Sequence, residues 1–305
     1  MIIIGVDENG LGPLLGPLVV TAAAFRTTSD DPQSLWELRG DDLPADDSKK
    51  LFSKSRRKTA EAAFIKWLQL FGHSPTTYGA LFDAVCENPG LDLANCQKKN
   101  VLCEPSRNIL LPVWTTQQST VISPALRNRI DATGITPLSL RAFSLCPGHF
   151  NARNNAKEMH KFLLDFELML RLIQKTALEY PNEMVFAICG KIGSTRFYGP
   201  WFEFMGYGQL QVVAETRACS EYNVETLGRI QFVRDADSAC LPVAVASMVG
   251  KYLRELAMLQ LNRTLGAGLR EASGYRDRVT ADFVSQTSEQ RRQLHIDDDC
   301  FLRRS

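Results

Sequence analysis

The chain opens with Met1-Ile-Ile-Ile-Gly-Val-Asp-Glu-Asn-Gly-Leu-Gly-Pro13, and this stretch decides the fold. Residues 1–6 are apolar and rich in isoleucine, a composition that predicts a buried strand. The glycines and the proline that follow predict a tight turn, because glycine reaches backbone angles that other residues avoid and proline fixes φ. A second apolar run at residues 18–25 predicts a neighbouring strand on the far side of this loop.

Two adjacent carboxylates, Asp7 and Glu8, stand where the first apolar run stops. Paired carboxylates at the mouth of a central strand cost desolvation free energy unless a group neutralises them. A divalent cation would do so, and oxygen ligands suit Mg²⁺ or Mn²⁺. The alternative is an ordinary loop that begins with a capping residue, which an isolated Asp-Glu pair would favour.

The composition is that of a globular protein: 305 residues, 45% hydrophobic and 23% charged. The net charge of +1 gives no overall basic surface, so a nucleic-acid partner would need a local basic patch. No apolar run approaches the roughly 20 residues that span a bilayer. The start lacks the basic and apolar regions of a secretory signal. We therefore expect a cytoplasmic protein with no membrane partner.

The eight cysteines are widely spaced and include no CxxC pair. Cys86, Cys96, Cys103 and Cys146 fall in one region and could form a zinc site, but their spacing matches no common zinc finger. Buried free thiols are the alternative that this spacing favours.

Strands mixed with long helices indicate an α/β fold. We expect a catalytic domain over residues 1–265, with 75–135 as an insertion or lid, and a partly helical tail over 266–305. Ser53 is the expected N-cap of one helix, and Pro242 is expected in the first turn of another. The helices are expected over 53–71, 154–180 and 242–260, and the further strands over 138–145, 184–188, 209–214 and 228–234.

Three separated segments together resemble ribonuclease HII, the type 2 ribonuclease H family. The first is the strand–loop–strand opening, Gly5 to Val20, and the second is Asp47-Ser48-Lys49-Lys50-Leu51. The third is Ala236-Asp237, followed by Ala246-Ser247 and then by Lys251 and Arg254. Each segment alone is a weak signal, but all three occur in the family's order.

The resemblance implies a ribonuclease H-like mixed β-sheet flanked by helices, with four carboxylates that hold two divalent metals. Asp7 and Glu8 match the first two carboxylates, and Asp237 matches the last. The metals, Mg²⁺ or Mn²⁺, would stabilise the attacking water and the leaving oxygen in phosphodiester hydrolysis.

Further residues are expected to contact the nucleic acid. Lys49 and Lys50 would contact phosphates, and the helix N-terminus near Ser247 would add backbone donors. Tyr275 is a candidate to stack on a sugar or base, although its surroundings match the family poorly. Arg196, Phe197 and Tyr198 could line a nucleic-acid groove by charge and stacking, or belong to a half-buried helix start.

Two positions depart from the family pattern. The strand that should end in the third carboxylate ends in Cys189, and a thiol is a poor ligand for Mg²⁺. Either Asp235 or Glu215 replaces it, or one metal is held weakly and activity falls. Leu11 stands where the family has an arginine between two glycines. Gly10 and Gly12 can still present backbone groups to a ribose 2′-hydroxyl, but Leu11 cannot make the charged contact.

The sequence therefore predicts a monomeric metal-dependent ribonuclease that cleaves the RNA strand of RNA–DNA hybrids. Two alternatives stay open. One is a catalytically impaired nucleic-acid-binding protein of the same fold, and the other is a ribonuclease H-like DNA nuclease such as a resolvase.

Overall fold

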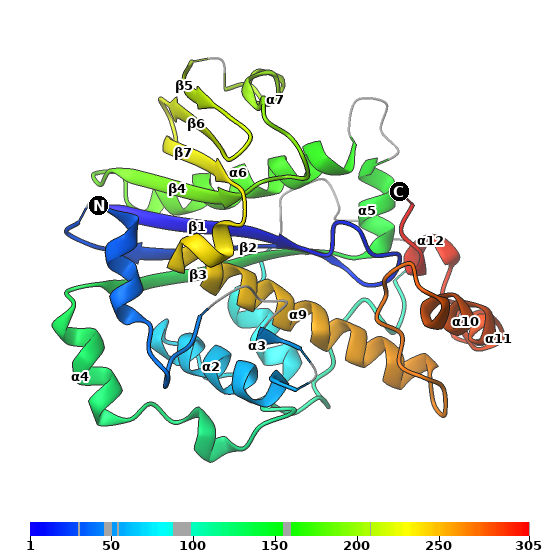
Figure 1. The fold of residues 1–305 in the computed structure, drawn as a ribbon. Coiled ribbons are helices and arrows are strands. Elements are labelled where there is room, and N and C mark those ends of the chain that lie inside the picture. The colour runs from blue at the N-terminus through cyan, green and yellow to red at the C-terminus, as the bar shows by residue number, and fades with distance from the viewer. Residues whose placement is uncertain are drawn as a thin grey trace.

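A mixed seven-stranded sheet forms the centre of the molecule, in the order β3-β2-β1-β4-β7-β6-β5 (Figure 1). The computed structural model describes residues 1–29, 31–45, 51–53, 55–87, 99–154, 160–207 and 209–304. The strands are β1 (Ile2–Asn9), β2 (Leu18–Arg26), β3 (Thr136–Leu145), β4 (Val185–Gly190), β5 (Leu210–Glu215), β6 (Cys219–Val224) and β7 (Gly228–Val233).

Three strands run parallel at the centre of the sheet. β1 pairs with β4, and β4 pairs with β7, both in parallel, whereas the outer pairs are antiparallel. The carboxyl ends of β1, β4 and β7 therefore meet at one edge of the sheet, where ligands bind in open α/β sheets.

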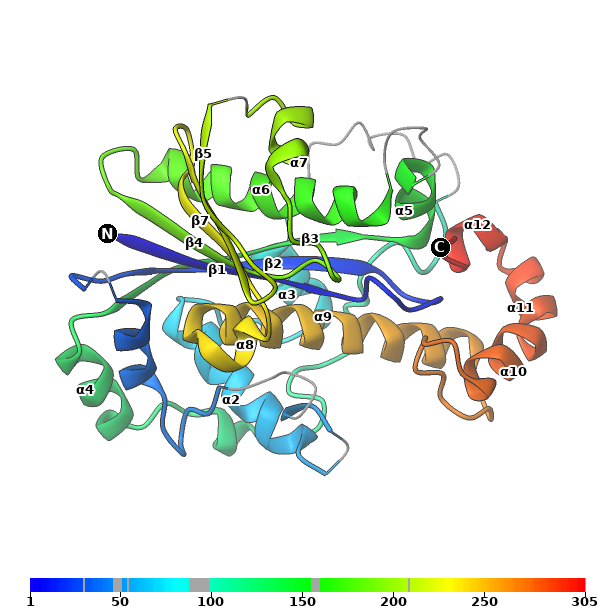
Figure 2. The ribbon, with the colours of Figure 1, turned by 45° about the horizontal axis from the view of Figure 1, so that its top comes forward.

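Helices cover both faces of the sheet (Figure 2). On one face lies α6 (Lys161–Glu179), whose leucines and phenylalanines pack against Ile2, Ile4 and Val6. On the other lies α9 (Leu241–Leu265), which packs against the opposite side of β1 and β2. Successive side chains of β1 point to opposite faces of the sheet, so this strand contributes buried residues to the core on each face. The expected mixed sheet flanked by helices is confirmed.

The start of α9 lies directly against β1. A side chain at Gly5 would collide with the backbone of Pro242 and Val243, so only glycine permits this approach. Pro242 occupies the first turn of the helix, as predicted.

The remaining helices are shorter than α6 and α9. They are η1 (Pro32–Leu38), α2 (Arg57–Leu70), α3 (Tyr78–Val85), η2 (Gln117–Thr120), α4 (Pro124–Ala132), α5 (Pro147–Asn154), α7 (Gly199–Phe204), α8 (Ala236–Ala239), α10 (Arg278–Gln286), α11 (Ser288–Gln293) and α12 (Asp298–Phe301). None of the described helices combines the length and apolar character needed to cross a membrane.

Several predicted boundaries were wrong. The first long helix begins at Arg57, and Ser53 does not cap it. The second begins at Lys161, where the His160 side chain accepts a hydrogen bond from the Leu163 amide. α5 ends before it, at Asn154. A side-chain cap of this kind can set the start of a helix where the apolar periodicity alone indicates a different boundary.

Strand β6 was not predicted. Its sequence, Cys219-Ser-Glu-Tyr-Asn-Val224, alternates buried and more exposed side chains, but the exposed ones are polar. Antiparallel pairing with β5 and β7 stabilises it, which short-range patterns do not reveal.

The described parts of residues 75–135 contribute to the core under α9. Leu81 and Val85 of α3 and Leu126 and Ile130 of α4 are buried there. The tail forms its own small core, in which Phe283, Ile296 and Phe301 pack against the carboxyl half of α9.

Candidate active site

A polar cavity of about 340 Å³ opens where β1, β4 and β7 end. The adjacent carboxylates Asp7 and Glu8 line it together with Asp237, which comes from a distant part of the sequence. The predicted residues Asp235, Ser247 and Tyr275 line it too. The complete lining is Asp7, Glu8, Asn9, Gly10, Leu11, Gly12, Pro13, Gly190, Lys191, Asp235, Ala236, Asp237, Ser247 and Tyr275.

Asp7 is the most enclosed carboxylate of this cavity. Burial raises its pKa well above the usual value, and the charges of Glu8 and Asp237 raise it further. The Ser247 side chain, on α9, offsets part of this effect by hydrogen bonding to the carboxylate. A Cβ at residue 190 would lie 2.6 Å from Asp7 Oδ1, so the glycine at the end of β4 leaves room for this carboxylate.

Asp237 lies in the first turn of α8, directly after β7. Asp235 precedes it with a left-handed backbone, φ 53°. The exposed Asp235 carboxylate forms an ion pair with Arg234 at 3.5 Å. Glu215, the other predicted replacement ligand, instead accepts a hydrogen bond from the Tyr222 hydroxyl at 2.5 Å and does not line the cavity.

Cys189 faces away from this cavity. It pairs in register with Val6, and both side chains pack in the core beneath α6. Burial raises the pKa of its thiol, and the charges of Asp165 and Asp7 raise it further. The thiol is therefore a neutral core group in the structure.

Asp165 is a buried acid that the sequence analysis missed. It lies on α6, fully inside the core, and neither carboxylate oxygen has a hydrogen-bond partner among the described residues. Burial raises its pKa well above the usual value, and the charge of Asp7 adds to the shift. The available signal was a lone acid in the apolar run Phe162-Leu-Leu-Asp-Phe166.

The donor chemistry of the cavity suits a hard divalent cation. Asp7, Glu8 and Asp237 present carboxylate oxygens, and a cation would relieve the repulsion that raises the pKa of Asp7. Over the described part of the chain, no three acidic, histidine or cysteine side chains converge closely enough to coordinate one ion. The carboxylate oxygens thus line one cavity, but among the described residues they do not form a complete set of ligands for one ion.

The glycine loop forms another wall of the cavity. Gly10 has φ 98°, a conformation that glycine adopts without strain, and Gly10, Leu11 and Gly12 all line the opening. Lys49 and Lys50 lie outside the described residues. Ser247 lies in the interior of α9, because the helix begins at Leu241, so the predicted helix N-terminus at Ser247 was wrong.

The comparison with protein families gives a match to the N-terminal part of the chain. Residues 4–72 match the family model of Ribonuclease HII. The match supports a divergent member of the ribonuclease HII family. It includes the carboxylate pair and the glycine loop, whereas Asp237 lies beyond it. No curated protein matches the chain.

Solved ribonucleases are similar over nearly the whole chain, at low identity. Ribonuclease HII from Archaeoglobus fulgidus, in a complex with PCNA, is 17% identical with a TM-score of 0.46, covering 99% of this chain and 94% of that chain. Ribonuclease H2 from Pyrococcus horikoshii is 15% identical with a TM-score of 0.47, covering 99% and 92%. Bst-RNase HIII in complex with Mn²⁺ is 15% identical with a TM-score of 0.43, covering 99% and 66%.

Basic side chains flank the acidic cavity on its β4 side. Lys191 lines the cavity and donates a hydrogen bond to Thr216 O at 2.8 Å. Burial lowers its pKa, and the charges of Arg196 and Arg234 lower it further. Like charges gathered beside an opening favour a polyanion there.

Only part of the predicted groove at residues 196–198 is accessible. Phe197 is 53% exposed, and the Arg196 guanidinium lies 4.3 Å from the centre of its ring. Tyr198 is fully buried, and its hydroxyl accepts a hydrogen bond from the Ile192 amide. Of the two alternatives, the helix start fits Tyr198, which is the N-cap residue of α7 and stacks on Phe232 in the core.

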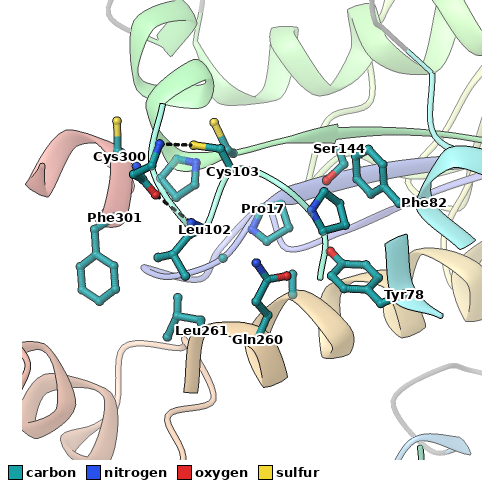
Figure 3. A pocket seen from close by; sticks show the side chains of 16 residues that line it. Pro17, Tyr78, Phe82, Leu102, Cys103, Ser144, Gln260, Leu261, Cys300 and Phe301 are labelled. Atoms are coloured by element: carbon teal, nitrogen blue, oxygen red, sulfur yellow. Dashed lines mark hydrogen bonds between the residues drawn. The ribbon is translucent and has the colours of Figure 1, made fainter. Parts of the chain in front are cut away.

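A second cavity lies between α9, the tail and β3 (Figure 3). Its walls include Pro17, Leu102, Phe301 and the thiols of Cys103 and Cys300. It shares no lining residue with the acidic cavity and contains no acidic side chain. Neither cysteine forms a disulfide with another described residue, in line with the wide spacing of the cysteines in the sequence.

Proposed function

We propose that this protein is a metal-dependent endoribonuclease that hydrolyses the RNA strand of RNA–DNA hybrids. One observation carries the proposal: Asp7, Glu8 and Asp237, far apart in the sequence, share one cavity with the glycine loop. The family match over residues 4–72 supports a ribonuclease H activity.

Asp7, Glu8 and Asp237 would hold Mg²⁺ or Mn²⁺, with Asp235 as a further ligand at the rim. The Bst-RNase HIII structure that contains Mn²⁺ supports this choice of metals. When bound, the cations would supply a more acidic water and positive charge at the leaving oxygen.

The chain's own residues orient the substrate around these carboxylates. Ser247 holds the Asp7 side chain, and the backbone of Gly10 and Gly12 is placed to contact a ribose 2′-hydroxyl. Tyr275, at the mouth, offers a partly exposed ring for stacking. Leu11 supplies no charged contact, so we expect weaker selectivity for RNA–DNA junctions than an arginine would give.

The position of Cys189 favours a second candidate, a hybrid-binding protein with impaired catalysis. The residue that matches the family's third carboxylate is a buried thiol that faces α6 rather than the cavity. Only three carboxylates would then hold the metals firmly, because Asp235 is exposed and paired with Arg234.

Cleavage of an end-labelled RNA–DNA hybrid, with and without Mg²⁺ or Mn²⁺, tests the proposal. We expect metal-dependent products with 5′-phosphate ends, and loss of cleavage in Asp7→Asn. Binding without cleavage would support the impaired protein. A panel that adds a duplex with one ribonucleotide and a branched DNA completes the test, since cleavage of the branched DNA alone would overturn the ribonuclease assignment.

A further inference from the structure

The backbone of the glycine loop is held by an arginine close to the end of the sequence. Arg303 is only 3% exposed, and its Nε and Nη2 atoms both donate to Pro13 O, at 3.0 and 2.5 Å. Its backbone amide donates to Leu14 O at 2.9 Å. One residue thus satisfies two successive carbonyls of the loop.

A second buried arginine holds the next carbonyl. Arg254, on α9, donates from Nη2 to Leu15 O at 3.3 Å. The amides of Leu14 and Leu15 donate in turn to Gly274 O, at 2.7 and 3.0 Å. Residues 13–15 are therefore hydrogen bonded both to α9 and to the tail. They follow directly after the glycines that line the cavity.

These arginines are not part of ordinary ion pairs. Neither guanidinium forms an ion pair with a carboxylate of the described residues, and each retains a buried N–H group without a partner there. Burial lowers the pKa of Arg303 to about 9, and the charge of Arg254 contributes. Two buried cations side by side destabilise the fold in isolation, so stability alone does not explain them.

Their placement does suit a site for a polyanion. The Arg254 guanidinium lies 5.2 Å from the centre of the Tyr275 ring, which lines the cavity. The positive charges thus stand directly behind the loop and the aromatic residue that face the substrate. Charge in a poorly solvated position acts more strongly than charge exposed to water.

We propose that Arg303 is a positioning residue for substrate recognition, which holds the glycine loop in the conformation that contacts the ribose of RNA. The inference rests on the proposed function. It makes the tail a working part of the active site, which acts through the backbone of residues 13–15.

Binding without turnover tests the proposal. Fluorescence anisotropy with Ca²⁺ in place of Mg²⁺ gives the Kd of a labelled RNA–DNA hybrid and of a DNA duplex with the same sequence. We expect R303A to weaken hybrid binding about tenfold, because the loop is no longer held in its binding conformation before the hybrid arrives, and DNA binding much less. R303K keeps the charge but replaces the two donor nitrogens of the guanidinium by one ammonium nitrogen, so its hybrid affinity should lie between those of the parent protein and R303A.

Arg304 supplies the matched control. It is the adjacent arginine, but it is exposed and forms an ion pair with Asp299. R304A should leave the ratio of hybrid to DNA affinity unchanged. Thermal unfolding in the presence of Mn²⁺ shows whether the metal-induced rise in Tm survives in R303A, as expected if only the loop is disturbed.

The outcomes separate this inference from the proposed function. If the parent protein discriminates and R303A and R303K keep its ratio of hybrid to DNA affinity, the positioning role is overturned while the proposed function stands. If the parent binds both duplexes equally, the positioning role fails as well, whereas the proposed function is decided separately by cleavage of the labelled hybrid.

Discussion

Asp165 combines full burial with a complete lack of hydrogen-bond partners among the described residues. Its neighbour Glu167 provides the contrast on the same helix, because Glu167 forms ion pairs with Arg153 and Arg171. An unsatisfied buried carboxyl destabilises a fold by a few kcal/mol even when it is protonated. Asp165 is thus retained despite its cost to stability.

We predict that Asp165→Leu raises the free energy of unfolding at pH 7.5 by about 1–3 kcal/mol. The pKa of Asp165 is raised in the folded state, so its carboxyl becomes increasingly unfavourable as the pH rises above the ordinary value of 3.8. The gain should therefore shrink as the pH is lowered toward 4. Urea unfolding at a series of pH values measures it, and Glu167→Leu should instead lower stability.

A new carboxylate at position 189 should have the opposite effect on stability to the removal of Asp165. Cys189→Asp should lower the free energy of unfolding by more than about 2 kcal/mol, because the new carboxylate would be buried beside Asp165. It should not increase cleavage of a hybrid. Cys189→Ser is the matched control, and a C189D protein that is both stable and more active would contradict the observed side-chain direction.

At the scale of elements, the order of strands brings the basic side chains to the cavity. Lys191 follows β4, and Arg234 follows β7, so parallel pairing places both at the edge where β1 presents its carboxylates. Along this edge Lys191 follows the strand that lies between β1, whose last residues include Asp7 and Glu8, and β7, which leads into Arg234 and Asp235.

We predict that Lys191→Ala weakens binding to hybrid and DNA duplexes alike, through a lost phosphate contact. The slope of log K against log salt concentration should become shallower by about 0.9. Arg26→Ala is the control, because Arg26 is committed to an ion pair with Glu183 near the other ends of the central strands. Anisotropy titrations at several salt concentrations measure the slope, and equal slopes for K191A and R26A would count against this contact.

Sequence patterns were informative where the determinants are local. The strand–loop–strand opening and Pro242 in the first turn of α9 followed from apolar runs and proline position, and the grouping of Asp7 with Asp237 in one cavity was implied by the resemblance to ribonuclease HII. Long-range properties were not accessible in this way. The side of the sheet that Cys189 faces depends on strand register, the partners of Asp165 depend on packing, and β6 depends on its neighbours.

At the scale of the whole molecule, the acidic cavity links metal binding to stability. Burial raises the pKa of Asp7, and repulsion by Glu8 and Asp237 raises it further, so a cation that binds only the folded protein and neutralises this charge stabilises it by mass action. We predict that millimolar Mn²⁺ raises the Tm of the parent protein and that removal of the metal by a chelator reverses the rise.

The sign of the pH dependence follows from the same charges. Protons compete with the metal for Asp7, whose pKa is raised, so the Mn²⁺-dependent rise in Tm should grow as the pH increases above the ordinary range of an aspartate. Differential scanning fluorimetry between pH 5 and 8 measures the effect. Asp7→Asn should abolish it, and an equal rise at every pH would refute carboxylate ligation.

The bond from Arg303 to Pro13 joins residues 290 positions apart in the sequence. We expect a contact with so large a sequence separation to form late in folding, because its two ends meet only after most of the intervening chain has folded. The same bond can also break by partial unfolding. If the small helices of the tail detach while the sheet remains intact, the glycine loop loses its support, and substrate recognition is lost without global unfolding. Amide hydrogen exchange should then find the loop and the tail opening together, as one cooperative unit.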